Sequence, residues 1–233
     1  MRGKIFFIVG AVVLFLMIFF IKSSLNIRQN SIPAVVPAET RPGGNTSGTD
    51  VGSQNQNTAP INSVSESRPP LDRASERVTK KPFGIFVTLQ NSPVQPEHFT
   101  GYHTGTDFEI FPEELNIDVQ VKAVCSGKLL FKKYATGYGG VAVQACELEK
   151  QPITVVYGHL KPNSIKANIG DTLNASDALG ILGKAYSQET GGERKHLHLG
   201  FHKGTAIDIL GYVQNQAGLS GWLDPCRFVC GGW

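Results

Sequence analysis

The stretch Lys195-His196-Leu197-His198-Leu199-Gly200-Phe201-His202 is the most informative part of this sequence. Its polar and apolar residues alternate, which is typical of a strand with one polar face and one face toward a core. On a strand, residues two positions apart share a face and lie roughly 6.5–7 Å from each other. His196 and His198 are therefore predicted to converge on one ion or one substrate atom, rather than to hydrogen-bond to each other.

The same strand-like pattern recurs from residue 81 to residue 228. Short apolar runs are separated by Gly, Pro and Asn, and no long segment has a helical period. We predict an all-β domain there, a compact β-barrel or sandwich, with strands in the segments 119–124, 128–134, 141–146, 153–157, 178–182 and 197–201.

The first 22 residues contain an unbroken apolar run, 5–21, preceded by Arg2 and Lys4. Seventeen apolar residues with a basic flank predict a single-pass transmembrane helix whose short N-terminal end stays in the cytoplasm. A cleaved signal peptide is the alternative, although its apolar region is usually shorter. Both interpretations place the rest of the chain outside the cytoplasm.

Residues 23–80 are rich in Ser, Asn, Thr, Pro, Gly and Gln and almost free of aromatic side chains. Such a segment cannot bury enough apolar surface to offset its ordering entropy, so we predict a disordered tether. The last five residues, 229–233, are expected to form a short tail.

The net charge of the exported part argues against one class of partner. Without Arg2 and Lys4, the chain has 20 of its 22 basic residues and 19 acidic ones. This near balance does not favour nucleic-acid binding, which normally needs a concentrated basic face.

Four cysteines, Cys125, Cys146, Cys226 and Cys230, all lie in the predicted exported part, where disulfides persist. Four cysteines allow three pairings, and the sequence does not choose among them. Cys226 and Cys230 could instead be zinc ligands, but no second Cys/His pair with zinc-finger spacing is nearby, so a structural role is favoured.

Two further motifs carry polar groups suited to chemistry. In His103-Thr104-Gly105-Thr106-Asp107, a tight turn at Gly105 would bring the imidazole and the carboxylate together. His159 follows Tyr157-Gly158 at the end of a predicted strand. Each motif alone has a simple structural explanation, a turn-capping Asp or a surface His. Catalytic zinc, however, needs three such ligands and a nearby group that moves a proton, and spacing does not say which of these five residues would bind.

In this order, His-x-x-x-Asp, Tyr-Gly-His-Leu and His-Leu-His, followed by Trp-Leu-Asp-Pro near the end, the motifs resemble the M23 family of peptidoglycan endopeptidases, the lysostaphin and LytM type. The resemblance covers about residues 82–228. It implies a LytM-like antiparallel fold and one Zn²⁺ per chain, bound by His103, Asp107 and His198. It also implies that His159 and His196 line the catalytic pocket, whereas His98 and His202 are extra histidines that we expect at the surface.

The resemblance implies a membrane-anchored zinc endopeptidase that cuts stem peptides or cross-bridges of peptidoglycan in the periplasm or cell-wall space. One alternative is a non-catalytic LytM-like module that binds and activates a cell-wall amidase, and another is a zinc carboxypeptidase. The family usually has Gly-Pro before His-x-His, where this chain has Arg194-Lys195. The bond that is cut, and whether the linker inhibits the site, stay open.

Overall fold

A computed structural model describes residues 67–231. The predicted anchor and most of the predicted tether, residues 1–66, lie outside the described residues, as do residues 232–233. Within the described part, no helix has the length and apolar character needed to cross a bilayer.

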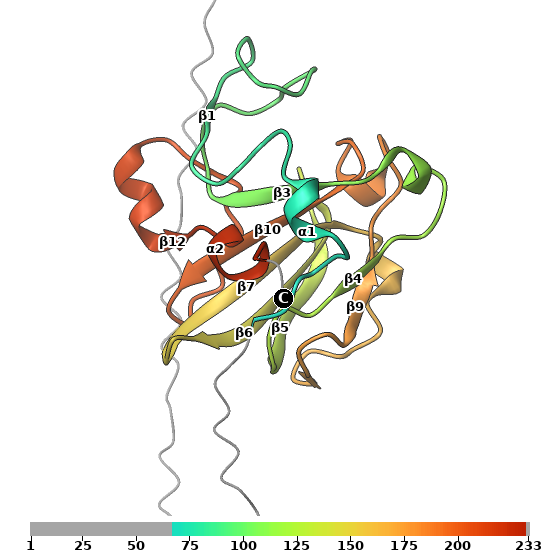
Figure 1. Ribbon diagram of the computed structural model, residues 1–233, viewed down its shortest axis with the longest axis vertical. Coiled ribbons are helices and arrows are strands. Elements are labelled where there is room, and N and C mark those ends of the chain that lie inside the picture. Colours follow the sequence, from blue (N-terminus) through green and yellow to red (C-terminus); the bar gives the residue numbers. More distant parts are fainter. Residues whose placement is uncertain (1–66, 232–233) are drawn as a thin grey trace, which may run out of the picture. The chain divides into compact units, whose positions relative to one another are not determined.

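The described domain is mostly β, and the strands paired within it are antiparallel (Figure 1). The largest sheet has seven strands in the order β12-β10-β7-β6-β5-β8, and β3 pairs with β10 beside β12. Its strands are β3 (Gly105–Glu109), β5 (Gly127–Ala135), β6 (Gly139–Leu148), β7 (Gln151–Leu160), β8 (Thr172–Leu173), β10 (His196–Lys203) and β12 (Trp222–Leu223).

Two smaller sheets and several short helices complete the domain. One sheet has the order β1-β2-β11 and the other pairs β4 with β9. Their strands are β1 (Phe86–Val87), β2 (Gly101–His103), β4 (Gln120–Lys122), β9 (Ala178–Ile181) and β11 (Tyr212–Val213). The α-helices are α1 (Ala74–Arg77) and α2 (Cys226–Val229), and the 3₁₀ segments are η1 (Pro112–Glu114), η2 (Pro162–Ser164), η3 (Gln188–Thr190) and η4 (Gln216–Gly221).

Strand β10 separates the core from the polar site. Leu197, Leu199 and Phe201 are fully buried in the main core, which α1 and α2 cover in front of the large sheet (Figure 1). His196 and His198 alternate with them and point to the opposite face. The predicted alternation is thus confirmed, because the packing of the three apolar side chains in the core fixes the opposite face as the one that the histidines share.

All six predicted strands are present, as β4, β5, β6, β7, β9 and β10. Each predicted segment overlaps its strand, with boundaries that differ by a few residues. The described residues thus form a mostly-β antiparallel domain, as predicted, and they also contain two one-turn α-helices.

The predicted boundary between tether and domain at residue 81 is wrong. Leu71 and Ala74 are buried in the main core. Arg77 is 3% exposed and pairs with Glu114 through two hydrogen bonds of 2.6 and 2.8 Å. Buried apolar side chains, the Arg77 ion pair and main-chain hydrogen bonds, such as that from Arg68 N to the carbonyl oxygen of Val124, attach residues 67–80 to the domain, although their composition resembles that of the linker.

The predicted start of the tail at residue 229 is also too early. Val229 is fully buried in the main core, and Cys230 forms a disulfide with Cys226. The second disulfide joins Cys125 to Cys146. The pairing that the sequence left open is therefore Cys125–Cys146 and Cys226–Cys230, and neither pair supplies metal ligands.

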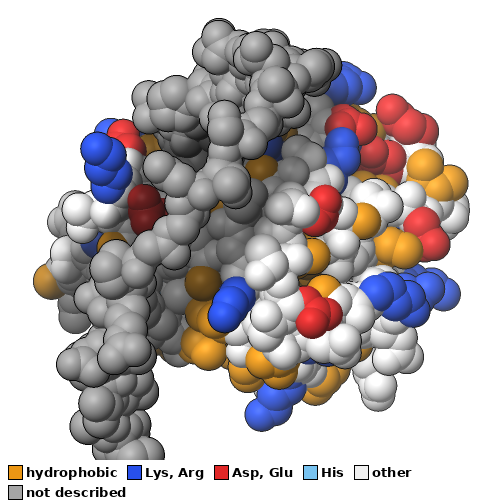
Figure 2. Space-filling view, turned by 90° about the horizontal axis from the view of Figure 1, so that it is seen from below, with side chains coloured by type: hydrophobic (Ala, Val, Ile, Leu, Met, Phe, Trp, Pro, Cys, Tyr) orange, Lys and Arg blue, Asp and Glu red, His pale blue; other side chains and the backbone are white. Residues whose placement is uncertain are grey.

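On the coloured part of the face drawn in Figure 2, basic and acidic side chains occur interspersed with hydrophobic and polar ones.

Candidate metal centre and catalytic pocket

The register of β3 against β10 brings the first two polar groups together. His198 lies directly opposite Asp107, and the next pair on that face is His196 opposite Glu109. Directly opposed residues of an antiparallel pair point to the same face. All four side chains are buried, with Asp107 2% and His198 3% exposed.

His103 reaches the same point from a different sheet. It ends β2, the chain bends at Thr104, and β3 starts at Gly105 in the large sheet. We predicted a tight turn at Gly105, but the bend is at Thr104. The glycine is needed for close approach instead, because a Cβ there would lie 2.7 Å from the His198 ring and 2.4 Å from the carbonyl oxygen of Leu199.

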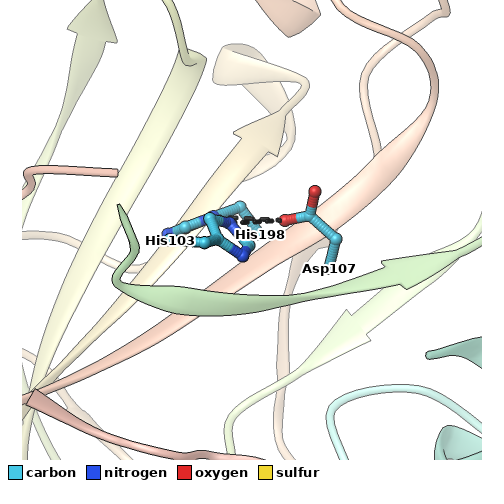
Figure 3. Close-up of side chains that lie close together, drawn as sticks. All are labelled: His103, Asp107 and His198. Atoms are coloured by element: carbon cyan, nitrogen blue, oxygen red, sulfur yellow. Dashed lines mark hydrogen bonds and ion pairs between the residues drawn. The ribbon is translucent and has the colours of Figure 1, made fainter. Parts of the chain in front are cut away.

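Three donor atoms form a small triangle (Figure 3). His103 Nε2 lies 3.0 Å from His198 Nδ1 and 3.2 Å from Asp107 Oδ1, and the latter two atoms are also 3.2 Å apart. His103 Nδ1 lies 3.3 Å from the carbonyl oxygen of Pro82, to which it can donate. That bond places the proton on Nδ1 and leaves the Nε2 lone pair toward the triangle. These three residues form a group whose donor atoms could hold a metal ion.

The second oxygen of Asp107 is occupied by other donors. Oδ2 accepts a hydrogen bond from Arg194 Nη2 at 2.9 Å and lies 3.3 Å from His196 Nε2. Burial opposes ionisation of this carboxyl, but His196 and His103 outweigh it and hold the pKa of Asp107 well below its usual range. Asp107 is therefore an anion with one oxygen in the triangle.

His159 enters the pocket through a β-bulge. The pairing of β6 with β7 shifts between Gly140 and Val141, so that His159 is an extra residue on β7, and its φ is 62°. Regular alternation would place it on the core side with Tyr157, whereas the bulge turns it to the face of Gly158, the residue opposite His198.

Main-chain carbonyls orient the two histidines outside the triangle. His159 Nδ1 lies 2.9 Å from the carbonyl oxygen of Thr190, and His196 Nδ1 lies 2.9 Å from that of Arg194. A donated proton at each Nδ1 leaves Nε2 as the nitrogen that can exchange a proton in the pocket. The ring centroids are 4.3 Å apart. Burial, followed by the neighbouring His196, holds the pKa of His159 well below its usual value, so this imidazole is neutral at pH 7.

Tyr138 forms another wall of the pocket. Its ring centroid is 5.3 Å from those of both His159 and His198. Its hydroxyl is buried and has no hydrogen-bond partner among the described residues. Burial also raises the pKa of Tyr138, so the hydroxyl stays protonated and can donate.

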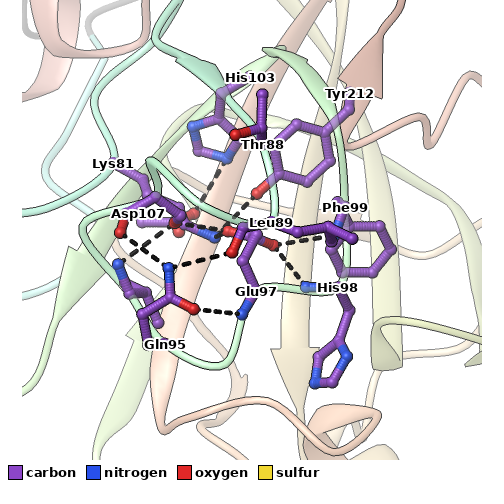
Figure 4. Close-up of polar contacts among 12 residues, drawn as sticks. Lys81, Thr88, Leu89, Gln95, Glu97, His98, Phe99, His103, Asp107 and Tyr212 are labelled. Carbon is purple, nitrogen blue, oxygen red and sulfur yellow. Dashed lines mark hydrogen bonds and ion pairs between the residues drawn. The ribbon is translucent and has the colours of Figure 1, made fainter.

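A buried ion pair supports the His103 side (Figure 4). Lys81 and Glu97 are 2.5 Å apart and both nearly inaccessible to solvent, and Lys81 also donates to the Tyr212 hydroxyl at 3.0 Å. The Tyr212 ring centroid lies 5.2 Å from that of His103. Neither Lys81 nor Glu97 belongs to a pattern that would have identified it from sequence, because their pairing depends on a loop that returns to the strand.

All five predicted site residues therefore line one pocket, namely His103, Asp107, His159, His196 and His198. The site residues predicted from the sequence did not include the other lining side chains, which are Lys81, Tyr138, Glu193, Arg194 and Tyr212. Of the extra histidines, His98 is exposed, as predicted. His202 was also predicted at the surface, but its side chain is only 17% exposed and its ring packs against Trp222.

Comparisons with known proteins agree with this arrangement. The family model for peptidase family M23 matches residues 101–209, which include all five site residues. This part of the chain is an M23 domain. No curated protein sequence matches the chain. M23 peptidases are zinc-dependent, and the domain is related to peptidoglycan hydrolases.

Solved structures with some similarity come from several bacteria. The catalytic domain of the antimicrobial peptidase lysostaphin from Staphylococcus simulans is 20% identical, with 66% of this chain and 93% of that chain covered and a TM-score of 0.45. LytU is 23% identical, with 64% and 84% covered and a TM-score of 0.43. A zinc-containing peptidase from Vibrio cholerae is 20% identical, with 59% and 36% covered and a TM-score of 0.38.

Proposed function

We propose that this protein is a zinc endopeptidase that hydrolyses peptide bonds in the stem peptides or cross-bridges of peptidoglycan. The observation that carries the proposal is the triangle of His103 Nε2, Asp107 Oδ1 and His198 Nδ1, with sides of 3.0–3.2 Å. It combines two imidazoles and one carboxylate, a ligand set that catalytic zinc sites use.

The dimensions of the triangle fit zinc. Zinc binds imidazole nitrogen and carboxylate oxygen at about 2.0–2.2 Å with tetrahedral angles, which places two ligand atoms about 3.3 Å apart. The observed separations are within about 0.3 Å of that value. Burial lowers the pKa of His198 to about 4, so its imidazole is neutral and its lone pair available. We assign His103, Asp107 and His198 as the residues that would hold one zinc ion per chain.

A bound zinc ion would supply Lewis-acid chemistry, by which a water becomes more acidic and a substrate carbonyl is polarised. The chain supplies the proton transfers. His159 is neutral and presents Nε2 to the pocket, so it can accept a proton from the attacking water. His196 Nε2 lies in the same pocket, 3.3 Å from Asp107 Oδ2. We therefore assign His159 as proton acceptor and His196 as the group that stabilises the developing oxyanion.

Two features support a proposed location outside the cytoplasm. The apolar segment 5–21 with its basic flank supports a single-pass anchor in the cell membrane. Two disulfides in the described domain fit an oxidising compartment. We propose that the domain acts in the periplasm or cell-wall space, with peptidoglycan as its substrate and the bilayer as its attachment.

The test uses the full-length chain in detergent. We expect about one zinc per chain by metal analysis, and soluble muropeptides released from purified peptidoglycan, whose masses identify the cut bond. His196→Ala should keep the zinc and lose the release. Well-folded protein that binds no zinc would contradict the proposal.

The same experiment separates the enzyme from an amidase-binding regulator. A regulator needs neither zinc nor the proton-transferring imidazoles, so the five converging side chains favour catalysis. If the zinc-loaded protein released nothing by itself but increased release by an added cell-wall amidase, the regulatory function would replace the proposal. Removal of only a terminal residue would indicate a carboxypeptidase.

A further inference from the structure

We propose that Arg194 and Glu109 form a positioning pair that makes Asp107 a one-oxygen metal ligand. The inference depends on the proposed zinc site, and it concerns how this chain holds its carboxylate. Arg194 and Lys195 occupy the two positions where the sequence departs from the Gly-Pro of the family it resembles. Neither glycine nor proline has a side chain that could donate a hydrogen bond there.

The contacts link three charged groups in a row. Arg194 Nε donates to both carboxylate oxygens of Glu109, at 3.0 and 2.9 Å, and its Nη2 donates both to Glu109 Oε1 and, at 2.9 Å, to Asp107 Oδ2. The side chains of Asp107, Arg194 and Glu109 are 3%, 8% and 10% exposed. Glu109 thus fixes the plane of the guanidinium, and one edge of that plane meets Asp107.

The two oxygens of Asp107 are consequently assigned to different tasks. Oδ2 is engaged by Arg194, while Oδ1 faces His103 and His198. A carboxylate without such an outer partner can rotate and offer both oxygens, or neither, to a metal. The hydrogen bond from Arg194 removes that freedom before any ion arrives.

The strand register explains why Glu109 is the partner. It lies opposite His196, one pair beyond Asp107 and His198 on the same face of β3 and β10. Arg194 precedes His196 by two residues, and its carbonyl oxygen accepts the hydrogen bond from His196 Nδ1. One residue therefore orients a proposed metal ligand through its side chain and a proposed catalytic imidazole through its backbone.

If Arg194 had only a structural role, its replacement would have a different effect on zinc affinity. Two buried carboxylates on one strand need a counter-charge, and a residue that only neutralised them would affect folding but not the metal affinity of the folded protein. The distinguishing variant is Arg194→Lys, which keeps the charge but loses the planar fork that reaches both carboxylates.

The experiment measures zinc affinity of the full-length chain by chelator competition, the absorption spectrum of the Co²⁺-substituted protein, and thermal unfolding. We expect Arg194→Lys and Arg194→Met to weaken zinc binding by about 10- to 100-fold and to alter the cobalt bands. Glu109→Gln should weaken binding in the same direction but less, because the amide oxygen can still accept from Arg194.

Arg77 provides the matched control. It is another buried arginine with a two-bond contact to a carboxylate, Glu114. Its Nη1 also donates to the main-chain carbonyl oxygen of Glu109 at 3.2 Å, but it has no hydrogen bond to the Glu109 carboxylate or to Asp107. Arg77→Met should lower the unfolding temperature and leave zinc affinity and the cobalt spectrum unchanged. If Arg194→Met fails to fold, Arg194→Lys and Glu109→Gln decide the question.

Two outcomes overturn the inference and can be told apart. Wild-type zinc affinity and an unchanged cobalt spectrum in folded Arg194→Lys would overturn the positioning role alone and leave the proposed enzyme intact. Absence of zinc binding by the wild-type chain would overturn both.

Discussion

The two halves of the pocket are built in different ways. Asp107 and His198 lie on β3 and β10 in regular register, and their face is fixed by the buried residues that alternate with them. His159 lies on a β-bulge with a φ of 62°, against the alternation of its strand. Two of the three proposed metal ligands are thus positioned by regular secondary structure, whereas the proton-transferring half depends partly on a strained residue.

This difference identifies His159 as a point of backbone strain in the pocket. A non-glycine residue in the left-handed region costs about 1–2 kcal/mol, and persists only where neighbours hold it. Two hydrogen bonds hold His159, one from its Nδ1 to Thr190 and one from the amide of Gly183 to its carbonyl, both at 2.9 Å. Strain at this point places the imidazole beside His196, which a regular strand could not do.

The metal-binding half should give the largest loss. His198→Ala removes one corner of the triangle, so we expect zinc to be lost and turnover to fall by more than about 10³-fold. Metal analysis and muropeptide release check both effects. The control is His202→Ala, on the same strand four residues further, whose ring packs on Trp222 outside the pocket. Zinc retained at full affinity in His198→Ala would remove this residue from the ligand set.

The other half should separate chemistry from metal binding. His159→Ala leaves the triangle intact, so we expect about one zinc per chain but a kcat lower by about 10²- to 10⁴-fold. Steady-state kinetics on a defined muropeptide measure this, with exposed His98→Ala as the control. A variant that lost zinc together with activity would contradict the division of the pocket into two halves.

A smaller effect should follow from crowding the metal-binding half. Gly105→Ala would place a Cβ 2.7 Å from the His198 ring, so the ring must move. We expect a stability loss of about 1–3 kcal/mol and zinc binding weakened by at least about tenfold. Gly221→Ala is the control, because its Cβ would meet only the His202 ring at an ordinary 3.6 Å. Unfolding midpoints and chelator competition would show whether the two glycines differ.

The same distinction explains how much the sequence could predict. His196, Leu197 and His198 alternate between polar and apolar residues as a strand with a core face and a polar face does, so the strand and both of its faces were predictable. The roles of the five site residues came from the resemblance and stay predictions.

What escaped prediction depends on contacts between distant segments. Bulging at His159 depends on how β6 pairs with β7, and the Arg194–Glu109 pair depends on the register of β3 and β10. Leu71 was assigned to the tether because its neighbours are polar, whereas burial of a single leucine depends on the surface it meets. None of these can be inferred from local composition or periodicity.

The smallest predicted effect tests the strain itself. In a regular strand, replacing alanine by glycine costs about 0.5–1 kcal/mol, because glycine loses more backbone entropy on folding. His196 lies within regular β10, so His196→Gly should be less stable than His196→Ala by about that amount. At position 159 the φ of 62° penalises alanine and not glycine. His159→Gly should therefore be more stable than His159→Ala by about 1 kcal/mol, and the sign of the difference should reverse between positions 196 and 159. Denaturant unfolding of the four zinc-free variants measures both differences, and the same sign at both positions would show that the bulge carries no strain.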